Sequence, residues 1–444
     1  MRRTILFILA LIFLSPLSYG CLAEEPGIAK VSSGSCHSLL LMDDGTVRAW
    51  GSNNPGFFYP GTINNSNWLV AIDGLNNCTS VSAGSGYSLA LKDDGTVWAW
   101  GNNYHGTLGD GSYDNHLTPA RVKNLDDITD VSSRGSHCLA LEDDGTVWAW
   151  GLNNNGQLGD GTQNAGKPLG KNIPVRVNIS NVKAIATGGI FSAALKDDGT
   201  VWAWGSNKFG VLGYEENRSS TIPVQIPGLS NITKITGGLG HMLALKDDGT
   251  VWAWGDNDHC RLGNETASEF NGFTGVWTPV KVGGLSNIVD ISAGNVHSMA
   301  LDSDGTVYCW GQNSDGQIGE GSEVSYEHYV PITVNGLKDI RNISCGGRNS
   351  MAIDSRGQLW AWGANIKGEC EILPVSNANM ITAPVLILNN LEYNNKTPII
   401  SPTMDETKTD LQNNWFSNSI LIKVLGIIGF IMIAIIIIYV KLRR

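Results

Sequence analysis

The sequence predicts an all-β fold, a seven-bladed β-propeller, from two observations: a repeat of about fifty residues and a large excess of glycine. The phrase Asp-Asp-Gly-Thr-Val-Trp-Ala-Trp-Gly, or a close variant, occurs seven times. Its last glycine falls at residues 51, 101, 151, 205, 255, 311 and 363. The 54 glycines among 444 residues indicate many tight turns. Repeats of this length bury their hydrophobic faces against their neighbours, so the chain is expected to form a closed array.

Each repeat can be divided into four short strands. In one repeat, an alternating stretch at 174–177 is followed by apolar stretches at 182–186 and 192–195, and then by the tryptophan-rich stretch 200–204. The turn before the last stretch contains two aspartates and a glycine. This composition favours a tight hairpin, because glycine adopts positive φ and aspartate accepts backbone hydrogen bonds. Four antiparallel strands in each of seven units are typical of a propeller.

The ends of the repeat region predict how the ring closes. The first unit begins at residues 27–32, which match the second strand of later units, so the first unit lacks a Pro-Val strand. A Pro-Val strand follows the last unit at 384–387. We therefore expect N-terminal and C-terminal strands to pair in one shared blade, which would remove free sheet edges.

The N-terminus resembles a secretory signal. Arg2 and Arg3 precede an apolar run at 5–14, and small residues follow it. The run is too short to cross a bilayer. Residues 1–23 are therefore predicted to be a signal peptide, and lipidation of Cys21 remains an alternative to cleavage after Ala23.

A second hydrophobic segment lies near the C-terminus. Residues 420–440 are apolar apart from Lys423, and as a helix they would span the roughly 30 Å of a bilayer core. They are predicted to form a transmembrane helix, with a cytoplasmic tail at 441–444. The polar segment 393–419 is predicted to be a stalk. We therefore expect a propeller at 24–392 that is anchored in the cell membrane by one pass and displayed outside the cell.

Charge and composition restrict the partners. The net charge is −11, and six of the 30 basic residues lie at the two extremities, so the body is more acidic than the whole chain. Such a body repels phosphate backbones, which argues against a nucleic-acid partner. Eight Asn-x-Ser/Thr sequons agree with export and predict a glycoprotein. The eight cysteines do not recur at equivalent repeat positions, so their pairing is left open.

Two short elements resemble a known repeat family. They are Trp-Gly-x-Asn-x-x-Gly-Gln-Leu-Gly at 150–159 and Gly-x-x-His-Ser-x-Ala-Leu at 294–301. They are similar to the RCC1 repeat, also called the regulator of chromosome condensation repeat, and the resemblance covers residues 27–391. Members of that family include a nuclear exchange factor for a small GTPase and a secreted bacterial β-lactamase inhibitor. The resemblance thus implies the propeller fold but no single activity.

A histidine recurs 14 positions before the last glycine of the repeated phrase. It is present in four units as His37, His137, His241 and His297, and the other units have Tyr87, Phe191 and Asn349. Tyrosine, phenylalanine and asparagine are poor substitutes for an imidazole ligand, so a metal-binding ring is disfavoured. We interpret these histidines as structural residues whose imidazoles bond to the backbone.

Two further features have a structural and a functional interpretation. The paired tryptophans, such as Trp202 and Trp204, lie on one face of a strand, which favours packing between blades over a platform for sugars. The turn at 302–305 could be a calcium loop, but it lacks the spaced ligands and distal glutamate, so an Asx turn is favoured. No catalytic motif is present, and we predict no enzyme activity, cofactor or metal.

The loops that differ between units are expected to determine specificity. The longest lie at 160–173, 264–278, 320–330 and 371–383, and all should emerge on one rim. Aromatic residues and one histidine in these variable loops are the candidate binding residues: Phe57, Phe58, Tyr59, Trp68, Tyr113, His116, Phe270, Phe273, Trp277, Tyr326 and Tyr329. The alternative is that they only fold over the blades.

Three functions follow from these observations. The favoured one is an extracellular recognition or adhesion module that binds a protein or polysaccharide through one rim. The second is a regulator of a protein partner, similar to a guanine-nucleotide exchange factor or an enzyme inhibitor. The third, a hydrolase or lyase with its site in the central channel, is disfavoured because no catalytic set is found. The sequence does not identify the ligand or the binding rim.

Overall fold

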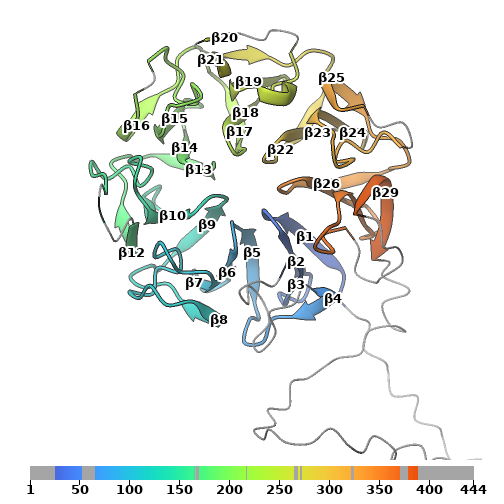
Figure 1. Cartoon of the computed structure of the whole chain (residues 1–444). Coiled ribbons are helices and arrows are strands. Elements are labelled where there is room, and N and C mark those ends of the chain that lie inside the picture. The colour runs from blue at the N-terminus through green and yellow to red at the C-terminus, as the bar shows by residue number, and fades with distance from the viewer. Residues whose placement is uncertain are drawn as a thin grey trace, which may run out of the picture. The chain divides into compact units, whose positions relative to one another are not determined.

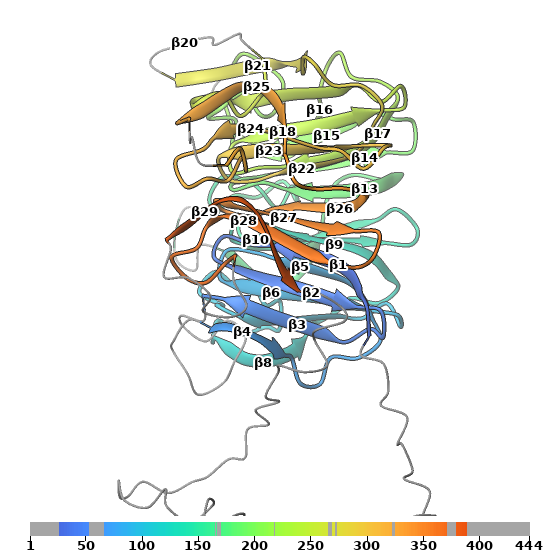
Figure 2. The same cartoon turned by 90° about the vertical axis from the view of Figure 1, so that its right-hand side faces the viewer.

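The computed structural model confirms a seven-bladed all-β propeller (Figure 1). It describes residues 26–52, 66–164, 166, 170–216, 218–264, 269–270, 273–321, 325–370 and 379–388. Each blade is an antiparallel sheet of four strands, and the fifth blade has a short extra strand at its outer edge. Figure 2 shows the same ring from its side.

The blades follow one another along the chain. The first blade contains β1 (Ile28–Ser33), β2 (His37–Met42), β3 (Val47–Gly51) and β4 (Ser66–Ala71). The second contains β5 (Cys78–Ala83), β6 (Tyr87–Lys92), β7 (Val97–Gly101) and β8 (His116–Arg121). The third contains β9 (Ile128–Ser133), β10 (His137–Glu142), β11 (Val147–Leu152) and β12 (Gly170–Arg176). The fourth contains β13 (Val182–Thr187), β14 (Phe191–Lys196), β15 (Val201–Gly205) and β16 (Ser220–Gln225).

The last three blades continue the same order. The fifth contains β17 (Ile232–Gly237), β18 (His241–Lys246), β19 (Val251–Asp256), the 3-10 turn η1 (Asp258–Cys260), β20 (Glu269–Phe270) and β21 (Phe273–Lys281). The sixth contains β22 (Ile288–Ala293), β23 (His297–Asp302), β24 (Val307–Gln312) and β25 (Glu327–Thr333). The seventh contains β26 (Ile340–Cys345), β27 (Asn349–Asp354), β28 (Leu359–Ala364) and β29 (Met380–Leu388). In every blade, the first strand lies at the channel (Figure 1). The last strand lies at the periphery, except in the fifth blade, where β20 lies outside β21.

The Asp-Gly hairpin has the predicted geometry. In the third blade, Gly145 has φ of 81°, which is a conformation that glycine adopts without strain. The Asp144 carboxylate accepts a hydrogen bond from the Thr146 amide at 2.8 Å. This Asx turn leads into the pairing of Leu141 with Val147 in β10 and β11.

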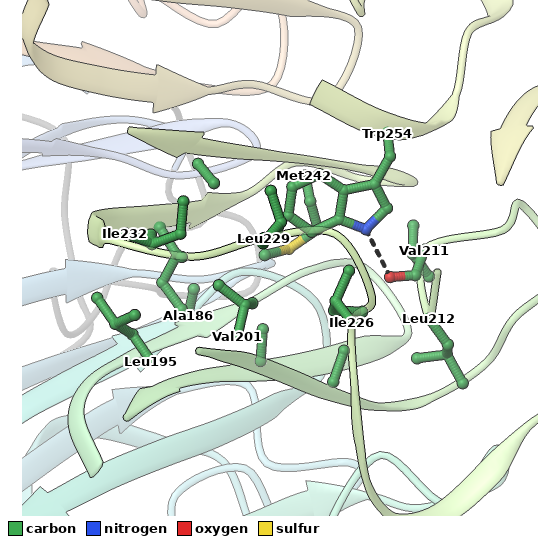
Figure 3. Close-up of a cluster of buried hydrophobic side chains, with 14 of the residues drawn as sticks. Ala186, Leu195, Val201, Val211, Leu212, Ile226, Leu229, Ile232, Met242 and Trp254 are labelled. Carbon is green, nitrogen blue, oxygen red and sulfur yellow. Dashed lines mark hydrogen bonds between the residues drawn. The ribbon is translucent and has the colours of Figure 1, made fainter. Parts of the chain in front are cut away.

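The hydrophobic core lies between the blades. A fully buried tryptophan near the end of each third strand packs on the preceding blade. Trp254 of β19, for example, covers Val211, Leu212 and Ile226 of the fourth blade (Figure 3). Its indole nitrogen donates to the Val211 carbonyl at 2.9 Å, so the buried N–H is satisfied. At six of the seven interfaces, apolar packing is thus combined with a hydrogen bond from the indole; the exception is Trp100, whose indole nitrogen has no partner among the described residues.

The prediction of a blade shared between the two ends of the array was wrong. Each blade is built from one continuous stretch of chain, and β29, which contains the 384–387 segment, pairs with β28 of its own unit. The Pro-Val strand is thus the outermost strand of the preceding unit and not the first strand of the next. The reason is local: this strand returns antiparallel beside the tryptophan strand that it follows. The peripheral strands remain sheet edges.

The ring instead closes through contacts between the first and seventh blades. The Ser33 amide donates to the Ser344 hydroxyl at 3.0 Å, and the Gly347 amide donates to the Gly34 carbonyl at 2.9 Å. Trp50 packs against the seventh blade, and its indole donates to the Glu369 carbonyl at 2.9 Å. This seam repeats the contacts found at the other interfaces.

The predicted terminal segments are not covered by the structure. The signal peptide at 1–23, the stalk at 393–419, the transmembrane helix at 420–440 and the tail at 441–444 all lie outside the described residues. Among the residues that are described, no helix is long and apolar enough to cross a membrane.

Candidate functional site

The two faces of the propeller carry different connections. Because the strands of a blade are antiparallel, the connection from first to second strand and the connection from third to fourth strand emerge on the same face. We call this the loop face, since it carries all the variable loops. The opposite face, the turn face, carries the Asp-Gly hairpins. The loop face surrounds one mouth of the central channel (Figure 1).

The recurrent histidines are structural, and their bonding partner differs from the predicted one. Their Nε2 atoms bond to serine hydroxyls of the next blade, where backbone partners were expected. The pairs are His37 with Ser88, His137 with Ser192, His241 with Ser298 and His297 with Ser350, at 2.8 to 2.9 Å. All four imidazoles are buried. They join neighbouring blades and are not exposed to a ligand.

The paired tryptophans share one face, as predicted, but their environments differ. The second of each pair, such as Trp204, is fully buried between blades. The first is half-buried, and a lysine covers it in three units: Lys92 lies 5.3 Å from the Trp98 ring centroid, and Lys196 and Lys246 cover their tryptophans similarly. Such cation–π contacts occupy the ring faces that a sugar would need.

In the six units where the structure describes it, a buried asparagine holds the start of the variable loop. Asn153, for example, accepts a hydrogen bond from the Leu158 amide at 3.2 Å and donates to the Thr162 carbonyl at 3.1 Å. The residue after this asparagine forms the exposed tip of the turn. It is Tyr104 in the second unit and Ile366 in the seventh, with 63% and 62% of the residue exposed. Sequence reasoning assigned this element to the scaffold and missed both. The signal was present, because the tip residue varies between units while the asparagine does not.

Several predicted binding residues fall outside what the structure describes. Phe57, Phe58 and Tyr59 lie in an undescribed segment, and for Trp68, Phe270 and Phe273 only the backbone is described. These six residues therefore remain predictions. The backbone places Trp68 in β4, Phe270 in β20 and Phe273 in β21.

Three other predicted residues make contacts that hold the loops in place. The Tyr113 hydroxyl donates to the Gly170 carbonyl of the third blade at 3.1 Å. His116 pairs with Asp110 at 2.8 Å. Burial acts to raise the pKa of Asp110, but hydrogen bonds from Ser112 and the nearby His116 lower it overall. Trp277 is half-buried and lies against Gly210 of the fourth blade. The two are so close that a Cβ atom added to Gly210 would lie 2.9 Å from the Trp277 indole.

The remaining two predicted residues, Tyr326 and Tyr329, form an exposed aromatic patch. They are 61% and 55% exposed. The Tyr326 ring lies 5.7 Å from the His259 ring of η1, centroid to centroid, and the Tyr329 hydroxyl donates to Glu327 at 2.9 Å. His259 is also 3.5 Å from both Glu327 and Asp258. We call these five residues the tyrosine patch. It joins η1 of the fifth blade to the start of β25 and the residue before it in the sixth.

The central channel is lined by polar side chains of the first strands. Near the loop face, serine hydroxyls accept amide hydrogen bonds from the next blade: Ser32 from Ala83, Ser82 from Ser133, Ser132 from Thr187, Ser292 from Cys345 and Ser344 from Ser33. These residues border a cavity of about 160 Å³ to which all seven blades contribute. The channel is thus hydrophilic at this level.

A single arginine crosses this end of the channel. Arg134 follows β9 of the third blade, and its Nη2 donates to the Cys345 carbonyl of the seventh blade at 3.2 Å and to the Ala293 carbonyl of the sixth. Its Nη1 donates to Asn295 Oδ1 at 3.3 Å. Burial lowers the pKa of Arg134 to about 10, so it is charged at neutral pH. This residue is not among the candidate residues predicted from the sequence.

Neither a metal site nor a disulfide is found among the described residues. No group of three or more His, Cys, Asp or Glu side chains there could hold a metal ion. No disulfide links the seven described cysteines, and only Cys36 among them is exposed. In the turn at 302–305, the Asp302 carboxylate binds nearby backbone amides. Its Oδ1 accepts hydrogen bonds from the Thr306 amide at 2.8 Å and from the Asp304 amide at 3.0 Å. This geometry is that of an Asx turn.

Comparison with known families identifies the fold. A family profile described as the RCC1-like domain matches residues 14–337, and a profile of the regulator of chromosome condensation (RCC1) repeat matches residues 340–369. The chain belongs to the RCC1-like family. The resemblance inferred from the repeated Trp-Gly and His-Ser elements is thereby confirmed.

Individual relatives match only part of this RCC1-like chain. The ultraviolet-B receptor UVR8 of Arabidopsis thaliana is 30% identical over 195 residues, which are 43% of each chain. The human E3 ubiquitin-protein ligase HERC2 is 29% identical over 210 residues, which are 45% of this chain and 4% of HERC2. This RCC1-like chain therefore spans less than half the length of these curated relatives.

Solved structures resemble this RCC1-like propeller in fold. Human WBSCR16 has a TM-score of 0.68 at 23% identity, covering 78% of this chain and 94% of that chain. Prp20p of Saccharomyces cerevisiae has a TM-score of 0.65 at 21% identity, covering 83% of this chain and 87% of that chain. At these identities the similarity shows the fold alone.

Proposed function

We propose that this RCC1-like propeller is a recognition module that binds a protein partner through its loop face and is displayed outside the cell by a membrane anchor. The observation that carries the binding role is a contrast among aromatic residues. At the repeated positions, aromatic rings such as Trp204 and Phe191 are completely buried. Tyr326, in the variable stretch before β25, and Tyr329, near the start of β25, are more than half exposed. Exposed tyrosines are typical of protein interfaces.

The chemistry of the tyrosine patch favours a partner with basic side chains. Asp258 and Glu327 lie beside the two tyrosines, and the whole chain has a net charge of −11. Tyrosine rings next to carboxylates attract arginine and lysine by cation–π and ionic interactions. A protein partner is also supported by relatives: one structure has Kap60 bound to yeast RCC1 (Prp20), and Prp20p has been analysed for binding to Gsp1p and histones.

A polysaccharide partner is less well supported. The half-buried tryptophans are the rings that could form a sugar platform, and lysines already cover three of them. The proposal therefore rests on the tyrosine patch and the loop face around it.

The binding role is tested with two variants of the full chain. The double variant Tyr326→Ala/Tyr329→Ala removes the exposed rings from the loop face. The control Val289→Ser removes an apolar side chain that is 54% exposed at the start of β22, on the turn face. Each variant is cross-linked in the cells that make the protein, and the amount of cross-linked partner is measured. We expect the double variant to recover at least tenfold less partner than wild type, and the control to recover as much as wild type. Equal recovery by all three would contradict a role for this patch.

The location is tested separately. The apolar run near the N-terminus and the segment 420–440 support export followed by anchoring. Protease added to intact cells is expected to degrade the propeller and to leave a small membrane-bound fragment. If the propeller stays intact until the cells are lysed, it lies inside them, and the extracellular proposal is wrong while the binding proposal stands.

A further inference from the structure

Arg134 borders the channel cavity to which all seven blades contribute. Six units have glycine at the position that Arg134 occupies in the third unit: Gly34, Gly84, Gly188, Gly238, Gly294 and Gly346. In four of them an added Cβ would lie within 3.0 Å of the ring at the recurrent histidine position, for example 2.1 Å from Phe191 at Gly188. The repeat therefore favours a residue without a side chain here, and Arg134 is a specific departure from it.

The charge of Arg134 is not neutralised by its partners. The guanidinium donates to two backbone carbonyls and to the amide oxygen of Asn295, all of which are uncharged. A guanidinium has five N–H groups, and these three hydrogen bonds leave two of them available to donate to a ligand. Elsewhere on the first strands, Lys234 pairs with Asp290, and Lys30 donates to the Ser80 hydroxyl at 3.4 Å. Arg134 is thus an excess positive charge at the cavity.

Free hydroxyl donors lie beside the guanidinium. The head of Arg134 reaches the sixth and seventh blades, where Ser292 and Ser344 border the cavity, and Ser32 follows in the adjacent first blade. Each of these three hydroxyl oxygens accepts an amide hydrogen bond, which leaves its hydrogen to donate. Within the described part of the chain, none of the three has an acceptor for that hydrogen.

We propose that the channel, just inside its loop-face mouth, is a binding site for a small oxyanion, held between Arg134 and the hydroxyls of Ser292, Ser344 and Ser32. An oxyanion such as phosphate, sulfate or a carboxylate has several acceptor oxygens and a negative charge, which match a guanidinium and a set of hydroxyl donors. The cavity of about 160 Å³ accommodates such an ion, since one water occupies about 30 Å³. The site is distinct from the tyrosine patch, so either proposal can fail without the other.

Titration of the full chain with phosphate tests the site. Wild type is expected to bind one equivalent, and Arg134→Gln to bind at least tenfold more weakly, because glutamine can still donate to the carbonyls but carries no charge. Arg348→Gln is the matched control. Arg348 lies on the loop face, is 57% exposed and pairs with Asp315, so its loss removes the same charge outside the cavity. This control is expected to bind phosphate like wild type.

A second variant and a direct location complete the test. Arg134→Gly restores the residue of the other six units, and it is expected to fold and to bind phosphate at least tenfold more weakly. Crystals soaked in selenate are expected to show selenium beside Arg134. The proposal would be overturned if wild type did not bind phosphate, or if Arg134→Gln bound it as tightly as wild type. It would also be overturned if Arg348→Gln weakened binding as much as Arg134→Gln does. Selenate found in the cavity of wild type but equally in Arg134→Gly would overturn the role of the guanidinium.

Discussion

The imidazole of His137 bonds to the hydroxyl of Ser192 in the next blade at 2.8 Å, and that hydroxyl donates to the Gln157 carbonyl at 2.8 Å. The same carbonyl accepts the Trp204 indole N–H at 2.9 Å. One backbone oxygen in the loop of the third blade thus receives two donors from the fourth. The Arg261 and Gln317 carbonyls likewise each accept hydrogen bonds from a serine hydroxyl and an indole of the next blade. At these three interfaces, the buried tryptophan and the serine after the recurrent histidine position therefore bond to the same carbonyl of the preceding blade.

Acid is expected to destabilise the propeller through the buried histidines. Burial lowers the pKa of His37 and His137 to about 4 and that of His297 to about 3, whereas an unfolded histidine titrates near about 6.5. Below pH 6.5 the unfolded chain binds more protons than the folded one. The stability is therefore complete above pH 6.5 and falls as the pH drops toward 4, by about 1.4 kcal/mol per pH unit for each histidine.

The variant His297→Phe tests this pH dependence. Phenylalanine occupies the same position in the fourth unit, where Phe191 is fully buried. The free energy of unfolding is measured in urea at pH 7, 6 and 5. Its dependence on pH is expected to be shallower in His297→Phe than in wild type, by about 1.4 kcal/mol per pH unit. As a control, Ser350→Ala removes the hydroxyl partner of His297 but keeps the imidazole, so it should lower stability at every pH while the slope persists. Identical slopes for His297→Phe and wild type would contradict the assignment.

The two tryptophans of one strand are expected to differ in their contribution to stability. Trp254→Phe removes the hydrogen bond to the Val211 carbonyl and leaves a void between the fourth and fifth blades, at an expected cost of about 2 to 4 kcal/mol. Trp252→Phe, two residues earlier, changes a half-buried ring that is covered by Lys246, and should cost less than about 1 kcal/mol. The free energy of unfolding in urea measures both. A cost for Trp252→Phe as large as that for Trp254→Phe would argue against the interface described.

The sequence was sufficient to predict the repeat, the strands and the hairpins, because each depends on residues that are close along the chain. The stretches at 182–186, 192–195 and 200–204 correspond to β13, β14 and β15. The grouping of strands into blades was not predictable in the same way. A Pro-Val strand lies in the sequence between the tryptophan strand of one unit and the first strand of the next. Its alternating pattern is therefore compatible with pairing in the sheet of either unit. Only the pairing, such as Ala149 with Val175, shows that it belongs to the preceding unit.

The candidate site was predicted only in part. Exposure of Tyr326 and Tyr329 followed from their place in a stretch of sequence that varies between units. Tyr113 and Trp277 also lie in such stretches, but they make contacts between blades. Sequence alone cannot separate these cases, since the partners of a loop lie in another unit. Arg134 was detectable as an arginine where six units have glycine. Its reach across the channel depends on ring closure, which only the structure reveals.

Two glycines with the same backbone conformation are expected to differ in their tolerance of a side chain. Gly210 and Gly228 have φ of 80° and 78°, so alanine costs about 1 kcal/mol at either from conformation alone. At Gly228 nothing lies within 4 Å of an added Cβ, whereas at Gly210 it would meet the Trp277 ring at 2.9 Å. Gly210→Ala should therefore destabilise by at least about 1 kcal/mol more than Gly228→Ala. Urea unfolding compares them, and equal costs would show that Trp277 moves away freely.

The buried asparagine of the Trp-Gly element is expected to order the variable loop that follows it. Asn153→Ala leaves the Leu158 amide and the Thr162 carbonyl without their partner, and should cost about 2 to 3 kcal/mol. The neighbouring Asn154→Ala changes an exposed side chain at the tip of the same turn, and should cost under about 1 kcal/mol. Because Asn153 bonds to Leu158 and to Thr162, its loss should also speed proteolysis within 158–164 under conditions where the blades remain folded. If Asn153→Ala were cleaved there no faster than Asn154→Ala, the loop would be ordered by other contacts, and the asparagine would support only the turn in which it lies.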